Sequence, residues 1–241
     1  MMRIQANGMP FQMLNHQIQK SGQKDIVIDG CLGQRYIGDG LSEQTITING
    51  TPGNALGAYL NGATLIVNGN AQDATGDTMN AGEIIIHGNS GDATGYAMRG
   101  GMILVKGDVG YRAGIHMKQY QQRIPALVIG GRAGSFLGEY QAGGIILVLG
   151  IGCHGEVPVG NFCGTGMHGG VMYLRCDSAP QSLPKQVAAS PATEADRTVI
   201  ETYLDAYCQA FGTDKKALMS QSYFALRPDT KNPYKQLYTQ N

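Results

Sequence analysis

The sequence predicts an all-β chain wound as a coiled β-solenoid, and three periodic features support this prediction. Glycine recurs every 19 residues from Gly38 to Gly114. A second glycine series with the same step runs from Gly50 to Gly107 and closes one short apolar run per repeat, such as Ile84-Ile85-Ile86. No helical spacing occurs inside the repeat, so each turn of the chain is expected to contribute a β-strand. The series predicts about seven coils.

Three columns of equivalent positions in successive repeats are apolar and are predicted to form the core, because side chains alternate in and out along a strand. Two later repeats are longer: the glycine step there is 24 and then 26 residues, with extra chain around Lys118 to Pro125 and between Gly152 and Cys163. The columns are Leu41, Leu60, Met79, Met98, Met117, Gln141 and Met167; Ile46, Leu65, Ile84, Ile103, Leu127, Ile146 and Met172; and Ile48, Val67, Ile86, Val105, Ile129, Val148 and Leu174.

The repeat divides the chain into three predicted parts. Residues 1–24 form an N-terminal helical cap, in which Phe11, Leu14 and Ile18 share one helical face. Residues 25–176 carry the repeats. Residues 177–241 form a linker, helices and a C-terminal arm, with the main helix expected to start at Ser190-Pro191 and end at Gly212.

Composition excludes several partners. Eighteen basic residues balance 18 acidic ones without a basic cluster, which argues against nucleic acid and anionic membranes. No apolar run is long enough to span a membrane, and the N-terminus has no signal-peptide pattern. Five irregularly spaced cysteines without a CxxC pair fit reduced thiols, so a cytoplasmic location is expected.

Polar residues that break the repeat are the candidates for contact with a partner. Arg99, Lys118 and His168 occupy the outward position that follows the methionine column. Four more candidates are Arg35, Arg112, His116 and Glu139. Arg35 stands where neighbouring repeats have Asn or Asp, Arg112 replaces the alanine of other repeats, and Glu139 stands where other repeats carry Asp, Ala or Tyr. Such departures indicate a functional surface, because the repeat does not require them. Ion pairs that brace the longer repeats are the alternative explanation.

Two stretches of the sequence have some features of a zinc site and of a phosphate-binding loop. Cys153, His154, Cys163 and His168 lie close in sequence, but they lack the paired spacing of a zinc site, so buried thiols and surface imidazoles are favoured. The run from Gly164 to Gly170 is rich in glycine, but it lacks the Lys-Ser/Thr and the helix of a phosphate-binding loop. It is predicted to be the turn of the seventh coil.

Several glycine-centred motifs together resemble the GXGXG domain, the C-terminal domain of the glutamate synthase large subunit. The similarity covers about residues 25 to 176, and the terminal segments look more like the stand-alone form of split systems. The motifs are Gly33-Gln34-Arg35-Tyr36-Ile37-Gly38, Gly76-Asp77-Thr78-Met79-Asn80, Gly95-Tyr96-Ala97-Met98-Arg99-Gly100-Gly101, Gly110-Tyr111-Arg112, Gly138-Glu139-Tyr140 and Gly164-Thr165-Gly166-Met167-His168-Gly169-Gly170.

The resemblance implies a right-handed parallel β-helix that acts as a non-catalytic scaffold subunit of an oxidoreductase in glutamate biosynthesis and nitrogen metabolism. Its expected partners are an amidotransferase (glutaminase) subunit and an FMN-dependent synthase subunit. FMN and an iron–sulfur cluster are expected in the synthase subunit, with no catalytic residue, cofactor-binding residue or metal ligand in this chain. Equivalent subunits of N-methylglutamate synthase or of a formylmethanofuran dehydrogenase-like complex are alternatives within the resemblance.

Other classes of protein remain as alternatives. A β-helical polysaccharide lyase or hydrolase would need acidic or basic residues concentrated on one strand face, whereas this face mixes Asn, Arg, Lys and His. A metal-dependent hydratase on a left-handed helix would have coils of 18 residues, whereas these have 19. A homo-oligomer joined by the terminal arms is also compatible with the sequence.

Overall fold

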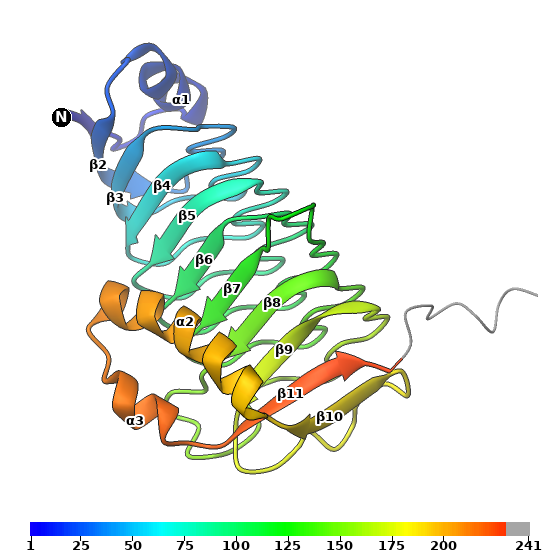
Figure 1. Ribbon diagram of the computed structural model, residues 1–241. Coiled ribbons are helices and arrows are strands. Elements are labelled where there is room, and N and C mark those ends of the chain that lie inside the picture. The colour runs from blue at the N-terminus through cyan, green and yellow to red at the C-terminus, as the bar shows by residue number, and fades with distance from the viewer. Residues whose placement is uncertain (230–241) are drawn as a thin grey trace, which may run out of the picture.

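The computed structural model describes residues 1–229, which form one mixed sheet of 11 strands and three helices (Figure 1). The sheet order is β1-β2-β3-β4-β5-β6-β7-β8-β9-β11-β10, with parallel pairing from β1 to β9 and antiparallel pairing of β9 with β11 and of β11 with β10. The elements are β1 (Met2–Gln5), α1 (Phe11–Lys20), β2 (Asp25–Leu32), β3 (Thr45–Thr51), β4 (Asn61–Asn68), β5 (Ala81–Ile86), β6 (Met102–Val105), β7 (Ala126–Ile129), β8 (Ala142–Val148), β9 (Gly169–Arg175), β10 (Val187–Pro191), α2 (Glu194–Phe211), α3 (Lys215–Met219) and β11 (Tyr223–Pro228).

The predicted fold class, an all-β right-handed parallel β-helix, is wrong. Each repeat contributes one strand to a single open sheet, and the rest of the repeat consists of turns. Single parallel bridges join neighbouring turns, for example Ala71 to Ser90 and Ser90 to Val109. Only the apolar triplet of each repeat has the pattern of a strand, because the remaining residues are rich in glycine and adopt turn conformations. The 18-residue helix α2 adds a helical layer that an all-β class omits.

The three predicted core columns are confirmed as interior positions. Leu60, Met79 and Met98 are fully buried, as are the isoleucines and leucines of the two strand columns. Leu41, at the open end, is partly buried. These side chains fill the space between the sheet and the stacked turns, so the repeats are held together by a continuous apolar interior.

A second apolar cluster lies on the outer face of the sheet. Leu104, Val128, Leu147 and Tyr173 point outward from β6 to β9, and α2 covers them as it crosses the ends of these strands (Figure 1). On the helix, the buried side chains recur with helical spacing at Ile200, Leu204 and Tyr207. The Tyr207 hydroxyl donates a hydrogen bond to the Lys106 carbonyl oxygen at 3.2 Å, which fixes α2 against the strand ends.

The terminal helices are confirmed, with altered bounds. Helix α1 buries Leu14 and Ile18 as predicted, and α2 ends at Gly212 in a left-handed cap. Helix α2 starts at Glu194, capped by Thr193, rather than at Ser190-Pro191, because those two residues belong to β10. Sequence reasoning also missed β1 and β11. The composition of residues 178–191 is compatible with a linker or a strand, and β10 is a strand within this segment. Within residues 1–229, no helix combines the length and apolar character needed to cross a membrane.

The predicted C-terminal arm falls partly outside the described residues. Its first part belongs to β11, which adds to the last repeat strand, while residues 230–241 lie beyond the part of the chain that the structure describes. The proposed division into parts at 24/25 and 176/177 stays a prediction.

Candidate functional site

The turn of each repeat contains three residues, spaced two positions apart, whose backbone has positive φ and lies in the left-handed region. The second is always a glycine, and the first and third are mostly larger residues. The alternation pairs the backbone in both directions along the stack. Amides of the outer residues donate to carbonyl oxygens of the next repeat, as from Tyr59 to Asp77, whereas the amide of the middle glycine donates to the preceding repeat, as from Gly57 to Ile37. The triplets are Tyr36, Gly38 and Gly40; Ala55, Gly57 and Tyr59; Ala74, Gly76 and Thr78; Ala93, Gly95 and Ala97; Arg112, Gly114 and His116; Phe136, Gly138 and Tyr140; and Phe162, Gly164 and Gly166.

The middle position of each triplet faces the core, which explains why it is glycine. A Cβ atom at Gly57 would lie 2.7 Å from Ile84 Cδ1, and one at Gly138 would lie 2.8 Å from the Met172 sulfur. The first and third positions point away from the core, and Tyr59 and Phe162 are more than half exposed. Side chains at these outer positions therefore form the outer edge of the turn stack.

Non-glycine residues at the outer positions have a stability cost. A left-handed conformation costs an ordinary L-residue roughly 1–2 kcal/mol. Hydrogen bonds between repeats hold this backbone in place: the His116 amide donates to the Glu139 carbonyl oxygen at 2.9 Å, and the Tyr140 amide donates to the Thr165 carbonyl oxygen at 2.8 Å. Backbone strain that is held by surrounding structure is typical of functional positions.

Large outer side chains occur at Tyr36 and Tyr59 in the first two repeats, and five more gather on the last three repeats. We call this surface the aromatic ridge, and it consists of Arg112, His116, Phe136, Tyr140 and Phe162. The His116 and Tyr140 rings stack with centroids 5.2 Å apart and planes 8° apart. The Phe136 and Phe162 rings stack at 4.9 Å, and the Arg112 guanidinium lies 5.1 Å from the Phe136 ring centroid.

Two further residues complete the surroundings of the aromatic ridge. Glu139 accepts a hydrogen bond from Arg112 Nε at 3.2 Å, which orients the guanidinium over Phe136. Tyr96 meets the edge of the His116 ring at 5.8 Å, nearly perpendicular to it. The result is a surface of stacked rings and one guanidinium that contact one another within the chain.

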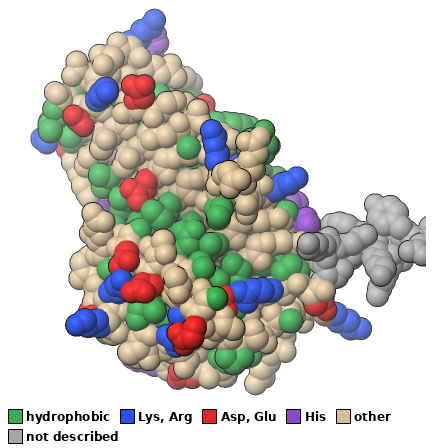
Figure 2. Space-filling model, viewed as in Figure 1, with side chains coloured by type: hydrophobic (Ala, Val, Ile, Leu, Met, Phe, Trp, Pro, Cys, Tyr) green, Lys and Arg blue, Asp and Glu red, His purple; other side chains and the backbone are tan. Residues whose placement is uncertain are grey.

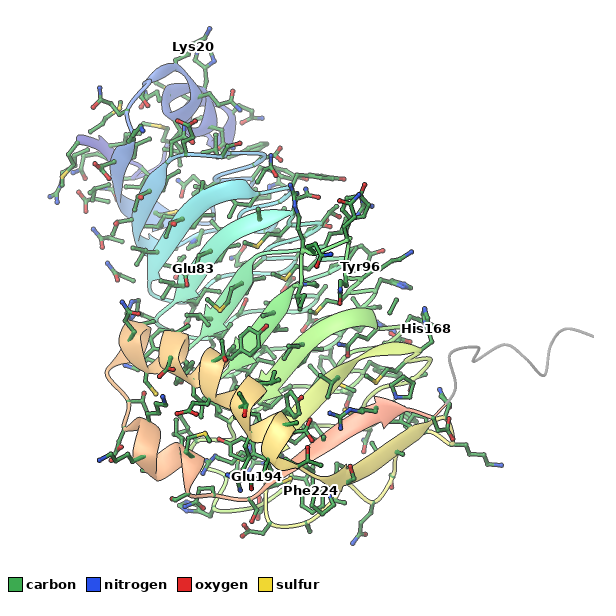
Figure 3. The ribbon with its side chains drawn as sticks, viewed as in Figure 1. Lys20, Glu83, Tyr96, His168, Glu194 and Phe224 are labelled. Atoms are coloured by element: carbon green, nitrogen blue, oxygen red, sulfur yellow. The ribbon has the colours of Figure 1, made fainter. Side chains whose placement is uncertain are left out.

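The structure brings together three of the seven predicted site residues, Arg112, His116 and Glu139. Figure 3 shows His168 on the same edge of the molecule as Tyr96, and the His168 Nδ1 atom is 3.0 Å from the Gly166 carbonyl oxygen. Arg99 and Lys118 are exposed in the column that includes His168.

Arg35 is in a different place, near the start of the sheet. Its guanidinium lies 5.0 Å from the Phe11 ring centroid, and its carbonyl oxygen accepts a hydrogen bond from Asn15. Arg35 therefore contacts α1 and not the aromatic ridge. Contact of any of the seven residues with a partner stays a prediction.

Sequence reasoning missed the aromatic members of the ridge, Phe136, Tyr140 and Phe162. A signal was present, because Phe136 and Phe162 continue the alanine column of Ala55, Ala74 and Ala93. The replacement of a small residue by phenylalanine in two successive repeats is as clear a departure as Arg112 in the preceding repeat. What the sequence could not give was the outward direction of this column.

The glycine-rich run and the Cys/His group singled out in the sequence both lie around the last turns of the stack. The run from Gly164 to Gly170 forms the seventh turn and the start of β9, with no helix following it. Within residues 1–229, no group of three His, Cys, Asp or Glu side chains is arranged to hold a metal ion. Cys163 is buried, and burial raises the pKa of its thiol to about 12.

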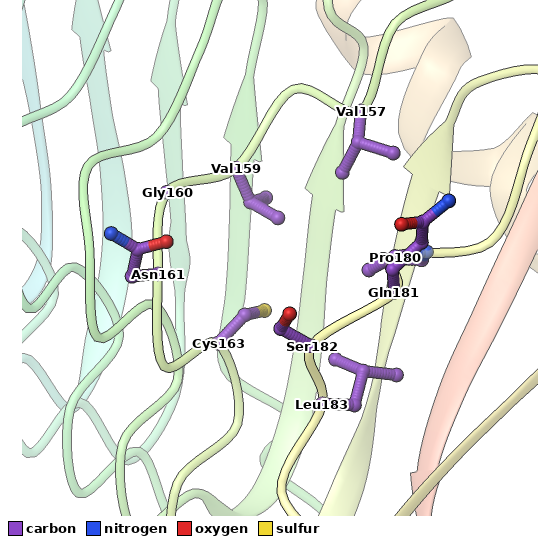
Figure 4. Close-up of a pocket in the computed structure, with 9 residues that line it drawn as sticks. All are labelled: Val157, Val159, Gly160, Asn161, Cys163, Pro180, Gln181, Ser182 and Leu183. Atoms are coloured by element: carbon purple, nitrogen blue, oxygen red, sulfur yellow. The ribbon is translucent and has the colours of Figure 1, made fainter.

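Cys163 also lines a pocket of about 170 Å³ between the last turn and the segment before β10 (Figure 4). Its walls include Val157, Val159 and Leu183, with Ser182 near the thiol. This lining mixes apolar side chains with the polar side chains of Asn161, Gln181 and Ser182, and within residues 1–229 it contains no charged side chain.

One open sheet backed by stacked, glycine-centred turns defines a class of repeat protein whose outer turn positions are free to vary. The chain belongs to the GXGXG motif family, whose model matches residues 20–229. An uncharacterized protein of Methanocaldococcus jannaschii is 43% identical over 249 residues, covering 98% of this chain and 95% of that protein. A chain in the crystal structure of the formyltransferase/hydrolase complex from Methylorubrum extorquens, solved with methylofuran, is also similar. It superposes with a TM-score of 0.65 and 24% identity, covering 83% of this chain and 72% of that one.

Proposed function

We propose that this chain is a structural subunit of a multi-subunit enzyme complex and that the aromatic ridge holds a partner subunit. The observation that carries the proposal is the stacked set of Arg112, His116, Phe136, Tyr140 and Phe162 on strained backbone. Aromatic residues and arginine are enriched where protein interfaces derive most of their binding free energy.

The repeat architecture suits a scaffold. Every turn is hydrogen-bonded to the turns beside it, and the core columns are continuous from the first repeat to the last. Such a body keeps fixed distances between surfaces on different repeats. A partner bound at the ridge and another bound elsewhere would therefore be held at a set separation.

The similar structure supports a complex of the formyltransferase/hydrolase or formylmethanofuran dehydrogenase-like class over the glutamate synthase type. A glutamate synthase-type scaffold is the second candidate, favoured by the glycine motifs between Gly33 and Gly170, which resemble the glutamate synthase domain. In that case FMN and the iron–sulfur cluster belong to the synthase subunit, and the amidotransferase is the other partner. In both cases the chemistry takes place on partner chains.

Purification of the tagged full-length chain from its own host, under mild conditions, tests the proposal. Native mass spectrometry is expected to give an assembly much heavier than the 25.6 kDa chain, with different proteins as its other members. Formyl transfer by the assembly would favour the first class. Flavin absorbance with 2-oxoglutarate-dependent glutamate formation would favour the second. A chain that runs alone, or only with copies of itself, contradicts the proposal.

A further inference from the structure

An apolar strip of the outer sheet face lies uncovered beside α2. Residues paired in register with Glu83 continue across the sheet as Met102, Ala126, Ile145 and Val171. Three of these side chains, Met102, Ile145 and Val171, are only partly buried. Figure 2 shows the corresponding hydrophobic surface over the strands next to α2. We call this strip, together with the elements that border it, the groove.

Helix α2 forms one wall of the groove. Its sheet-facing side chains are Ile200, Leu204 and Tyr207, but a second apolar row, Val199, Tyr203, Ala206 and Ala210, recurs at spacings of four, three and four residues. This row is half-buried. Ala206 and Ala210 share a groove of about 280 Å³ with Glu83 and Ile85, which places the row beside the sheet strip.

The longer fifth repeat forms the other wall. Its extra residues, Lys118 to Pro125, pack over the starts of β6 and β8: a Cβ atom at Gly143 would lie 2.6 Å from the Gln119 amide nitrogen, and one at Gly100 would lie 3.1 Å from Arg123 Cβ. Ile124 in this segment is 46% exposed. The insertion therefore borders the strip on the side where β6 and β8 begin.

Dimensions and charge indicate what the groove holds. From Glu83 on β5 to Val171 on β9 it spans four inter-strand steps, about 19 Å, which matches roughly 12 residues of α-helix at 1.5 Å per residue. Glu83 ends the strip as a half-buried carboxylate, and within residues 1–229 it has no ion pair. Burial raises the pKa of Glu83, so a cation beside it would be favoured.

We propose that this groove binds an amphipathic helix of a partner subunit, with its apolar face on Met102, Ile145 and Val171 and a lysine or arginine beside Glu83. The inference rests on the proposed function, because it requires a partner. A second copy of α2 is a poor occupant. Its basic residue, Arg197, already donates hydrogen bonds to the Met219 and Gln221 carbonyl oxygens, while Glu194, Glu201 and Asp205 are acidic.

Photo-crosslinking in the native host tests the groove. The full-length tagged chain would carry p-benzoylphenylalanine in place of Ile145, with the same replacement of Thr47 as the matched control on the same sheet face outside the groove. Mass spectrometry is expected to map the Ile145 adduct to a partner segment with apolar residues at three- and four-residue spacing and a basic residue at one end. Adding Glu83→Lys is expected to lower the adduct yield about fivefold, while Glu83→Gln lowers it less.

The outcomes separate the two proposals. An intact heteromeric assembly with no adduct from position 145, or with equal adducts from 145 and 47, overturns the groove and leaves the proposed function standing. An adduct to a second copy of this chain, or an adduct unchanged by Glu83→Lys, also overturns it. A chain that runs alone overturns both. Thermal unfolding followed by circular dichroism checks that each variant folds.

Discussion

The imidazole of His116 lies parallel to the phenol ring of Tyr140, at 5.2 Å between centroids, and both residues have left-handed backbone. Glycine would be the less strained residue at both positions, and Gly40 and Gly166 occupy the equivalent place in other repeats. A stacked pair kept at a cost in stability supports a role that depends on the side chains themselves.

Replacement of His116 by glycine should weaken partner binding while preserving the fold. Glycine relieves backbone strain, which offsets the lost stacking, so the free energy of unfolding should change by less than about 1 kcal/mol. Retention of partner chains by the tagged protein, measured by quantitative mass spectrometry, should fall about tenfold.

Thr78→Gly is the matched control, because Thr78 occupies the same outer position outside the aromatic ridge. It should leave partner retention unchanged. Equal losses from the two variants would show that backbone stiffness, and not the ridge, governs assembly.

Two glycines with left-handed backbone should differ sharply in their tolerance of alanine. At Gly62, with φ +133°, an added Cβ would lie 2.6 Å from the Ser42 carbonyl oxygen, so backbone atoms of neighbouring repeats would have to separate. At Gly40, with φ +65°, no atom lies within 4 Å of the added Cβ. We expect Gly62→Ala to lower the free energy of unfolding by about 3 kcal/mol and Gly40→Ala by about 1 kcal/mol. Urea denaturation of both variants checks this, and similar losses would contradict it.

The interior of this protein was predictable from sequence, whereas its fold class was not. The columns through Met79, Ile84 and Ile86 follow from a fixed repeat and from alternation along strands, which are local properties. Whether the rest of each repeat forms strands or turns depends on the conformation of Ala55, Tyr59 and their equivalents. Their left-handed geometry is set by hydrogen bonds from adjacent repeats, which no single repeat reveals.

Comparison of the repeats predicts the polar residues of the candidate site but not its aromatic residues. Arg112 places a charge in a column of alanines, and His116 and Glu139 also differ from the residues of neighbouring repeats, so comparison of repeats finds them. Phe136 and Phe162 were overlooked because an apolar residue in a repeat protein suggests the core. Only the three-dimensional turn shows that these rings point outward and stack under Arg112.

Three buried thiols should resist alkylation in the folded protein. Burial raises the pKa of Cys31 and Cys176 to about 11 and that of Cys163 to about 12. At pH 8 this lowers the thiolate fraction by roughly two orders of magnitude or more, and the thiolate is the reactive form. Iodoacetamide labelling followed by peptide mass spectrometry should modify these cysteines only after unfolding in guanidinium. Rapid labelling of Cys163 in the native protein would contradict its burial.

Asp196 should make the stability of α2 sensitive to acid. Burial opposes its ionisation, but hydrogen bonds from the Thr193 amide and hydroxyl, from Arg227 and from Tyr173 outweigh burial and lower its pKa to about 2. In the unfolded chain its pKa is about 3.9. Because the folded pKa is the lower one, the carboxylate stabilises the folded state above pH 4, and this contribution is lost as pH falls through 2.

We therefore expect Asp196 alone to account for about 2 kcal/mol of the decrease in unfolding free energy between pH 6 and pH 2. Urea denaturation at both pH values measures it, with Asp196→Asn as the variant whose decrease should be smaller by that amount. Thr193→Ala is the matched control: loss of the helix cap should cost about 1 kcal/mol. Because the Asp196 carboxylate keeps its bonds to Arg227 and Tyr173, most of the pH dependence should remain. If Asp196→Asn keeps the full dependence on pH, other carboxylates are responsible for it.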